Sequence, residues 1–132
     1  MEIGCGNGLV AELIKKQQIN FSITGVDFAK KMINNASKIN VTPAVKSSDI
    51  DEEIIKLKKP TTDIDEQAPQ VAYDILINKN FIDYADKINE KYDAVITRGV
   101  INYTANQQLF LQKAASLLAT NGLIIFYVSA PY

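Results

Sequence analysis

The sequence predicts an α/β fold in which helices cover both faces of an open parallel sheet. Short apolar stretches of strand length alternate with amphipathic stretches of helix length along most of the chain. The apolar run from Leu123 to Val128 is uninterrupted, which is typical of a strand buried on both faces. A turn that contains three of the six glycines joins the first predicted strand to the first predicted helix.

The first part of the chain contains two strand–helix pairs. Met1 to Ile3 is predicted to be the end of a strand, and apolar residues then recur at helical spacing from Leu9 to Ile14. The stretch from Phe21 to Asp27 predicts a second strand. A second helix follows, because apolar residues between Ala29 and Ala36 fall on one helical face and lysines fall on the other.

Residues 43 to 70 are predicted to be an insertion. Prolines interrupt this segment and acidic residues cluster in it, while no periodic pattern extends across it. A short helix that includes Ile50 and Leu57 is the one regular element that its pattern suggests. Two interpretations of this segment remain open. We favour a polar loop that is exposed to solvent, and the alternative is a lid over a substrate.

Regular structure resumes after the insertion. Tyr73 to Asn78 is predicted to be a third strand that is buried, and Tyr92 to Thr97 a fourth. A helix is expected from about Ala105 to Leu118, with its apolar residues at helical spacing. Thr120 to Gly122 is a stop and turn signal, and the fifth strand is expected from Leu123 to Val128.

The composition is that of one globular domain. The chain has 132 residues, of which 47% are hydrophobic and 22% are charged, so that a single core can form. A formal net charge of -1 disfavours nucleic-acid binding, because affinity for phosphates comes from clustered Lys and Arg. The absence of histidine excludes a histidine general base, a Ser-His-Asp triad and a histidine-ligated zinc within this chain.

The sequence also gives an expectation for the compartment. No stretch reaches the roughly 18 consecutive apolar residues that a membrane-spanning helix needs, and the first residues lack the pattern of a signal peptide. Cys5 is the single cysteine, so the chain has no internal disulfide, which fits a reducing compartment. We therefore expect a cytoplasmic protein that has no membrane partner.

The segment from Glu2 to Leu9 carries the clearest functional signal. Gly4, Gly6 and Gly8 alternate between a strand end and a helix start. Glycine leaves no side chain between the turn and a ligand, and the backbone amides at the helix start are expected to donate to a polar group of that ligand. Asp27 ends the next strand, where its carboxylate can accept both hydroxyls of a ribose.

These segments resemble the motifs of the class I S-adenosylmethionine-dependent methyltransferases, which have a Rossmann-like fold. EIGCGNG is similar to the first motif of that family, and ITGVDFAKKMINNA resembles the second. NKNFIDY, YDAVITRGVINY and LLATNGLIIFYV resemble the segments around the third, fourth and fifth strands. The resemblance implies a single domain over residues 1–132, a sheet with strand order 3-2-1-4-5, and S-adenosyl-L-methionine as the cofactor.

The resemblance also implies a set of cofactor-binding residues. Asp27 would hold the ribose hydroxyls, while Phe28 and Met32 would pack near the adenine. Asn80 stands where the family has an acidic residue that contacts the adenine amine, and Phe81 follows it. The complete set is Glu2, Gly4, Cys5, Gly6, Asn7, Gly8, Asp27, Phe28, Met32, Asn80, Phe81 and Arg98.

Several of these residues have a second interpretation. Glu2 would orient the glycine turn or contact the cofactor through water, or it is simply a charged residue at the start of the chain. For Cys5 a small apolar filler is favoured over a nucleophile. Arg98, the only arginine, would contact the methionine part of the cofactor or form a surface ion pair. Asn102 and Tyr103 occupy a stretch that contacts substrate in some family members, although core packing is favoured for Tyr103.

The resemblance implies transfer of a methyl group to a small-molecule acceptor, with no metal and with no catalytic residue assigned. The fourth strand is not followed by an Asn-Pro-Pro-Tyr or Asp-Pro-Pro-Tyr run, which disfavours methylation of nucleic-acid bases. A second hypothesis is a catalytically silent protein that binds the cofactor or a protein partner. It arises because the chain is expected to be cut short at both ends and to lack the final two strands of the family.

A dinucleotide-binding oxidoreductase domain is the third and least favoured hypothesis. Its glycine fingerprint has the spacing G-x-G-x-x-G, which places two residues between the second and third glycines. In this chain the glycines alternate, and Leu9 stands where the third glycine of that fingerprint would fall.

Overall fold

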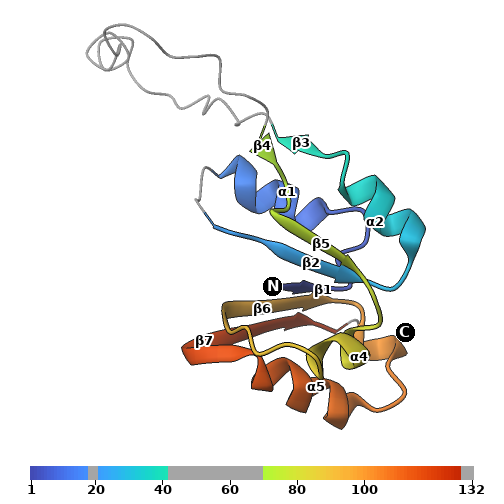
Figure 1. Cartoon of the computed structure of the whole chain (residues 1–132), viewed down its shortest axis with the longest axis vertical. Helices are drawn as coiled ribbons and strands as arrows, with labels where there is room; N and C mark the ends of the chain where they lie inside the picture. The colour runs from blue at the N-terminus through green and yellow to red at the C-terminus, as the bar shows by residue number, and fades with distance from the viewer. Residues whose placement is uncertain (18–20, 42–69, 129–132) are drawn as a thin grey trace, which may run out of the picture.

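A five-stranded parallel sheet forms the centre of the molecule in the computed structural model, which describes residues 1–17, 21–41 and 70–128. The strands lie in the order β5-β2-β1-β6-β7, which confirms the predicted order 3-2-1-4-5. Figure 1 shows the short β1 between β2 and β6. The bounds are β1 Glu2–Ile3, β2 Thr24–Asp27, β5 Ile75–Asn78, β6 Tyr92–Arg98 and β7 Leu118–Tyr127.

Helices pack on both sides of this sheet, as the sequence predicts. Figure 1 shows α1 and α2 on one side of the strands and α4 and α5 on the other. Their bounds are α1 Leu9–Lys16, α2 Lys30–Ala36, α4 Phe81–Ala85 and α5 Gln107–Ser116, with a 3-10 turn, η1, at Ile101–Tyr103. In the described part of the chain no helix has the length and apolar character to cross a membrane.

Two hydrophobic cores fill the space between the sheet and its helices. On one face Ile3, Val26 and Val95 of the central strands pack against Phe110 and Ala114 of α5. The core on the other face contains the remaining cluster of buried residues: Cys5, Ala11, Ile23, Ala36, Ala72 and Tyr73. The sheet therefore holds the loops that follow its strands in fixed positions.

The apolar run at the end of the chain is not buried on both faces, so this prediction is wrong. Strand β7 lies at the edge of the described sheet, and Leu123, Ile125 and Phe126 are all more than half exposed. The strand also begins earlier than predicted, at Leu118, because the expected turn is an irregularity within it, where Asn121 has a φ of 64°. An apolar run indicates a strand, but it does not distinguish an edge strand from a central one.

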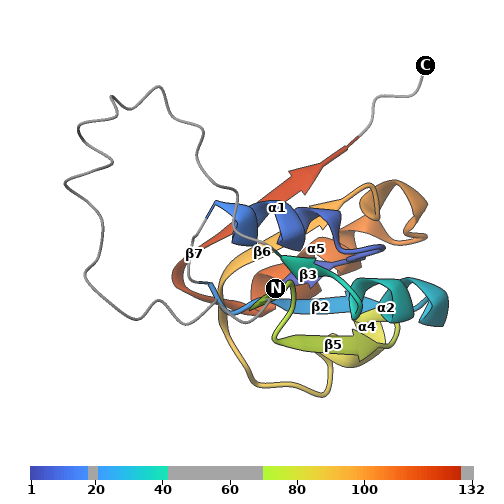
Figure 2. The same cartoon turned by 90° about the horizontal axis from the view of Figure 1, so that it is seen from above.

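The third predicted strand, β5, is likewise an edge strand, and it is only partly buried. Before it, the chain forms an antiparallel pair that the sequence pattern did not reveal: β3 at Asn40–Val41 pairs with β4 at Gln70–Val71. Strand β3 lies beside α1 (Figures 1 and 2). Apart from residue 70, the predicted insertion at 43–70, with its short helix and the lid interpretation, lies outside the described residues.

Candidate functional site

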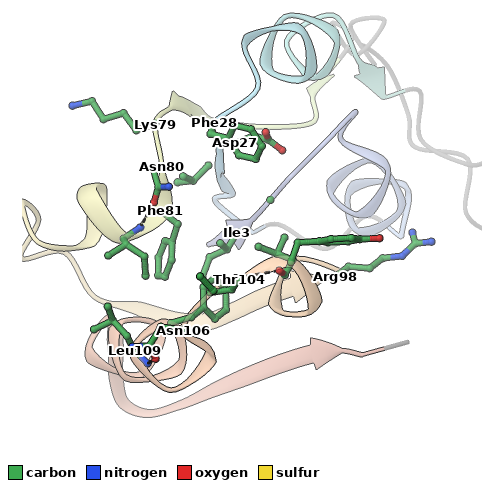
Figure 3. A pocket seen from close by; sticks show the side chains of 18 residues that line it. Ile3, Asp27, Phe28, Lys79, Asn80, Phe81, Arg98, Thr104, Asn106 and Leu109 are labelled. Carbon is green, nitrogen blue, oxygen red and sulfur yellow. Dashed lines mark hydrogen bonds between the residues drawn. The ribbon is translucent and has the colours of Figure 1, made fainter. Parts of the chain in front are cut away.

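The carboxyl ends of four parallel strands meet at one edge of the sheet, where they border a cavity of about 870 Å³. In the sheet β2 lies on one side of β1 and β6 on the other, so the chain changes direction at this point. Such switch points are where ligands bind in open parallel sheets. Figure 3 shows that the labelled residues around the cavity come from β1, β2, β6, α4, α5 and the loops between these elements.

The glycine turn after β1 is shaped by left-handed backbone conformations. Gly4, Gly6 and Gly8 have φ values of 68°, 53° and 86°, which side chains disfavour. A Cβ on Gly4 would lie 2.0 Å from Cγ2 of Val100, so only glycine fits there. A Cβ on Gly6 would meet no atom within 4 Å, so the chain is open to approach from that side.

Most described amides of this turn already have partners within the protein. The amides of Gly4 and Cys5 donate to the carbonyl of Val26 at 2.7 and 3.1 Å, and the amide of Gly8 donates to the carbonyl of Cys5 at 2.9 Å. The amide of Gly6 donates to Asp27. These four amides precede α1, so they are not the amides at the helix start that were predicted to donate to a ligand, and that prediction stays open.

Asp27 is fixed beside the glycine turn at the end of β2. Its Oδ2 accepts from the Gly6 amide at 2.9 Å, and its Oδ1 accepts from the Ala29 amide at 2.8 Å. The side-chain amide of Asn78, at the end of β5, donates to the carbonyls of Asp27 and Phe28 at 3.0 and 2.9 Å. Asp27 is thus buried and lines the cavity, and the amides of Gly6 and Ala29 fix the orientation of its carboxylate.

Aromatic and amide side chains form the next part of the wall. Phe28 is 80% exposed although it lines the cavity, so its ring is available to a ligand. Phe81 is buried and meets Phe110 edge-to-face, with ring centroids 5.1 Å apart. Asn80 Oδ1 accepts from the amide of Ile82 at 2.9 Å and so caps α4, which means that this oxygen already has one donor.

A smaller cavity of about 250 Å³ lies against the glycine turn, and Gly4 and Arg98 line both cavities. Glu2 lies in its wall and is buried, which argues against the interpretation of Glu2 as a merely solvated charge. Burial is the main influence on Glu2 and raises its pKa, while a hydrogen bond from the hydroxyl of Tyr73, at 2.6 Å, lowers the pKa.

Cys5 and Arg98 also line the smaller cavity. Burial, assisted by the carboxylates of Glu2 and Asp27, raises the pKa of the Cys5 thiol to about 12, so the nucleophilic thiolate is scarce at neutral pH. This supports Cys5 as a small apolar filler. Arg98 extends away from Asn80 (Figure 3), and within the described residues it forms no ion pair.

The structure brings the predicted site residues to the two cavities, with two exceptions. Gly8 is buried below Ile39 and Tyr73 instead, and Met32 lines neither cavity. Tyr103 was expected to pack in the core, and this is wrong: it is 91% exposed on η1 and lines the larger cavity. Within this 3-10 turn Ile101 is the residue that packs in the core, while Tyr103 lies on the exposed side.

Sequence reasoning missed several residues of the site. Tyr73 and Asn78 hold Glu2 and Asp27, but nothing in their local pattern reveals contacts across such long chain separations. Asn106, which lines the larger cavity, was detectable: an Asn just before a helix is a common N-cap, and its Oδ1 accepts from the amide of Leu109 at 2.9 Å.

The chain is similar to a known protein family and to several solved structures. The family model described as "Methyltransferase domain" matches residues 1–124. A search of curated proteins finds no match. Among solved structures, the plantazolicin methyltransferase BpumL in complex with SAH matches with 19% identity and a TM-score of 0.64, over 95% of this chain and 36% of that one.

Two further solved structures match in the same way. BpumL in complex with a triazolic desmethylPZN analog and SAH has 18% identity and a TM-score of 0.61, over 95% of this chain and 36% of that one. The plantazolicin methyltransferase BamL in complex with a triazolic desmethylPZN analog and SAH has 17% identity and a TM-score of 0.58. This match covers 93% of this chain and 35% of that one. At these identities the likeness establishes the fold, and the chain spans about a third of the length of these proteins.

Proposed function

The chain belongs to the methyltransferase domain family, and on this premise we propose that it binds S-adenosyl-L-methionine and transfers the methyl group to a small-molecule acceptor. The observation that carries this proposal is the placement of the Asp27 carboxylate on the wall of the larger cavity, where it accepts the amide of Gly6, a residue of the glycine turn with open space beside its Cα. A ribose diol needs a fixed acceptor next to a stretch of chain that it can approach closely, and these two residues supply both.

The residues fit the nucleoside part of this cofactor. A carboxylate has about four acceptor positions, and the oxygens of Asp27 each accept one backbone amide, so both retain capacity for a hydroxyl group. The exposed ring of Phe28 offers a face on which a planar base can pack. Asn80 and Phe81, on the same wall, are proposed as adenine contacts, with the second acceptor position of Asn80 Oδ1 facing the amine.

The residues also fit the amino acid part. Glu2 and Arg98, which carry opposite charges, both line the smaller cavity, and Gly4 and Arg98 also line the larger one. A zwitterionic amino acid carries one positive and one negative group, so two opposite charges in one small cavity complement it. Cys5, Gly6 and Asn7 would contact this part of the cofactor through their main chain.

The cofactor, when bound, supplies an electrophilic methyl group on its sulfonium. The chain contributes by holding the nucleoside at Asp27, by covering the base with Phe28 and by placing the acceptor in line, since alignment alone accounts for a large share of the rate. Such a reaction requires no histidine. An acceptor would reach the site through the part of the larger cavity near Tyr103 and Leu109, which come from η1 and α5.

The small-molecule acceptor is supported by two observations. The three solved structures described above are of plantazolicin methyltransferases, and two of these three are complexes with desmethylPZN analogs. The net charge of -1 disfavours nucleic acid as the acceptor. We also propose the cytoplasm as the compartment, in keeping with the single buried cysteine.

Calorimetric titration with S-adenosylmethionine and S-adenosylhomocysteine tests the site. Asp27→Asn is expected to raise the dissociation constant at least about tenfold, because an amide cannot accept the Gly6 amide and both hydroxyls as a carboxylate does. Asp83→Asn makes the same change of charge at an exposed position of α4 and is expected to bind like the parent. No binding to the parent at millimolar ligand would contradict the proposal.

A methylation assay and titrations with NAD and FAD separate the other hypotheses. A catalytically silent protein would bind the cofactor without methylating any member of a broad acceptor panel. A dinucleotide-binding domain would bind NAD or FAD in preference. That the family's final two strands are lacking stays a prediction, and the apolar side chains exposed along β7 support it.

A further inference from the structure

Glu2 and Tyr73 form a buried pair that connects two distant parts of the chain. Glu2 belongs to the central strand β1, and Tyr73 lies between β4 and β5. The hydroxyl of Tyr73 donates to Oε2 of Glu2 at 2.6 Å, and both side chains are buried. Because a buried carboxylate needs hydrogen-bond partners to be tolerated, this bond determines where the charge of Glu2 sits.

The ring of Tyr73 is also in close contact with the backbone of the site. A Cβ on Gly25, in β2, would lie 2.8 Å from Cε1 of the ring, and a Cβ on Gly8 would lie 3.0 Å from Cε2. Two glycines therefore make room for one tyrosine, whose ring lies against the start of α1 and whose hydroxyl reaches β1.

We propose that Tyr73 is a positioning residue of the cofactor site, which acts through Glu2 on the charged end of the cofactor. This inference rests on the proposed function. Tyr73 itself lines neither cavity, so it does not touch the ligand directly. Its hydroxyl keeps the carboxylate of Glu2 in the wall of the smaller cavity, beside Arg98 and the glycine turn.

The charged groups around Glu2 make this role measurable. Besides Tyr73, the groups that act on Glu2 are the amino group of Met1 and the guanidinium of Arg98, which favour its ionised form, and the carboxylate of Asp27, which disfavours it. Burial raises the pKa of Glu2, and the hydroxyl of Tyr73 partly offsets this. Loss of the hydroxyl therefore raises the pKa further and leaves less of Glu2 ionised near neutral pH.

The test uses Tyr73→Phe in the full chain, which keeps the ring against Gly8 and Gly25 and removes only the hydroxyl. We expect the dissociation constant for S-adenosylmethionine at neutral pH to rise about tenfold, as for the loss of a hydrogen bond to a charged group. Titrations between about pH 5.5 and 8.5 should show the affinity rising with pH, with the rise displaced to higher pH in Tyr73→Phe. In a Glu2→Gln background the same substitution should have no further effect.

Two controls distinguish positioning from a general structural role. 5′-Methylthioadenosine carries the nucleoside but lacks the amino acid part, so Tyr73→Phe should bind it as the parent does. Tyr92→Phe removes a hydroxyl that donates to the exposed Glu90 at 2.9 Å, away from both cavities, and should bind every ligand like the parent.

Each outcome decides one point. Equal weakening of both ligands in Tyr73→Phe, or an unchanged affinity and pH profile for S-adenosylmethionine, overturns the role of Tyr73 and leaves the proposed function standing. A parent chain that binds neither S-adenosylmethionine nor 5′-methylthioadenosine overturns the proposed function, and the inference falls with it.

Discussion

At the scale of single residues, the glycine turn contains two glycines that are required for different reasons. Gly4 combines a positive φ with direct contact to Val100, whereas Gly6 has a positive φ and open space beside it. A left-handed backbone costs a residue with a side chain about 1–2 kcal/mol. The cost of a substitution at Gly4 must therefore exceed that at Gly6, because steric overlap adds to the backbone cost.

We expect Gly4→Ala to lower the free energy of unfolding by more than about 2 kcal/mol and Gly6→Ala by about 1–2 kcal/mol. Val100→Ala removes the Cγ2 atom that lies 2.0 Å from the new Cβ, so the double variant Gly4→Ala/Val100→Ala should recover part of the loss. Urea denaturation of the parent, the three single variants and the double variant measures these differences in the free energy of unfolding. If the losses of stability caused by Gly4→Ala and Val100→Ala simply add in the double variant, the overlap between the new Cβ and Val100 is not the cause of the loss at Gly4.

The residues of the site differ in how far the sequence reveals them. Gly4, Gly6 and Asp27 were predicted because their roles depend on backbone geometry, which local spacing encodes. Tyr73 was missed because its partner is 71 positions away, and Tyr103 was misjudged because aromatic side chains are more often buried than exposed. Local pattern thus predicts the turn, while the side chains that support it depend on the tertiary fold.

At the scale of elements, Asn80 combines one observed role with one proposed role, and the two can be separated. It caps the five-residue helix α4 through its Oδ1, and it is proposed to contact the adenine. Helix α4 was not predicted, because five residues are too few to establish a helical period. Its start is nevertheless encoded in the Asn that accepts the amide of Ile82.

We expect Asn80→Ala to cost about 1 kcal/mol in the free energy of unfolding, since it removes the cap, whereas Asn80→Asp retains a good N-cap and should cost little. Asn106→Ala removes the equivalent cap of α5 and provides a matched comparison for the loss of stability. In cofactor titrations Asn80→Asp should bind at least as tightly as the parent, and Asn80→Ala more weakly. Equal affinity of all three Asn80 forms would remove Asn80 from the adenine contacts.

The strands were predicted in position and order, but not in their surroundings. The order was predicted from the resemblance to the family. Alternating strands and helices predict a parallel sheet but not the order of its strands, since β5 and β6 follow one another along the chain and yet lie on opposite sides of β2 and β1. Burial does not follow from this alternation: β5 and β7 have apolar sequences like central strands, and yet both lie at the edges of the described sheet. The β3–β4 pair escaped prediction because the two short strands pair across the segment between them.

At the scale of the whole molecule, the described sheet has an edge that is long, apolar and uncharged. Strand β7 has ten residues, and no charged residue follows Lys113 in the sequence. Leu123, Ile125 and Tyr127 alternate along one face of this strand, and each is more than half exposed. Proteins commonly protect such edges with charged residues, because an open strand pairs with other chains. We therefore expect the isolated chain to self-associate as its concentration rises.

Ile125→Lys is expected to reduce this self-association, because a charge in the middle of the strand opposes pairing between two copies. The exposed fraction of Ile125 is 52%, so its substitution should change the free energy of unfolding by no more than about 0.5 kcal/mol. Leu13→Lys adds the same charge on α1 at a side chain that is also 52% exposed, and it serves as the matched control. Light scattering over a concentration series measures association. If both variants reduce it equally, net charge rather than the β7 edge governs association.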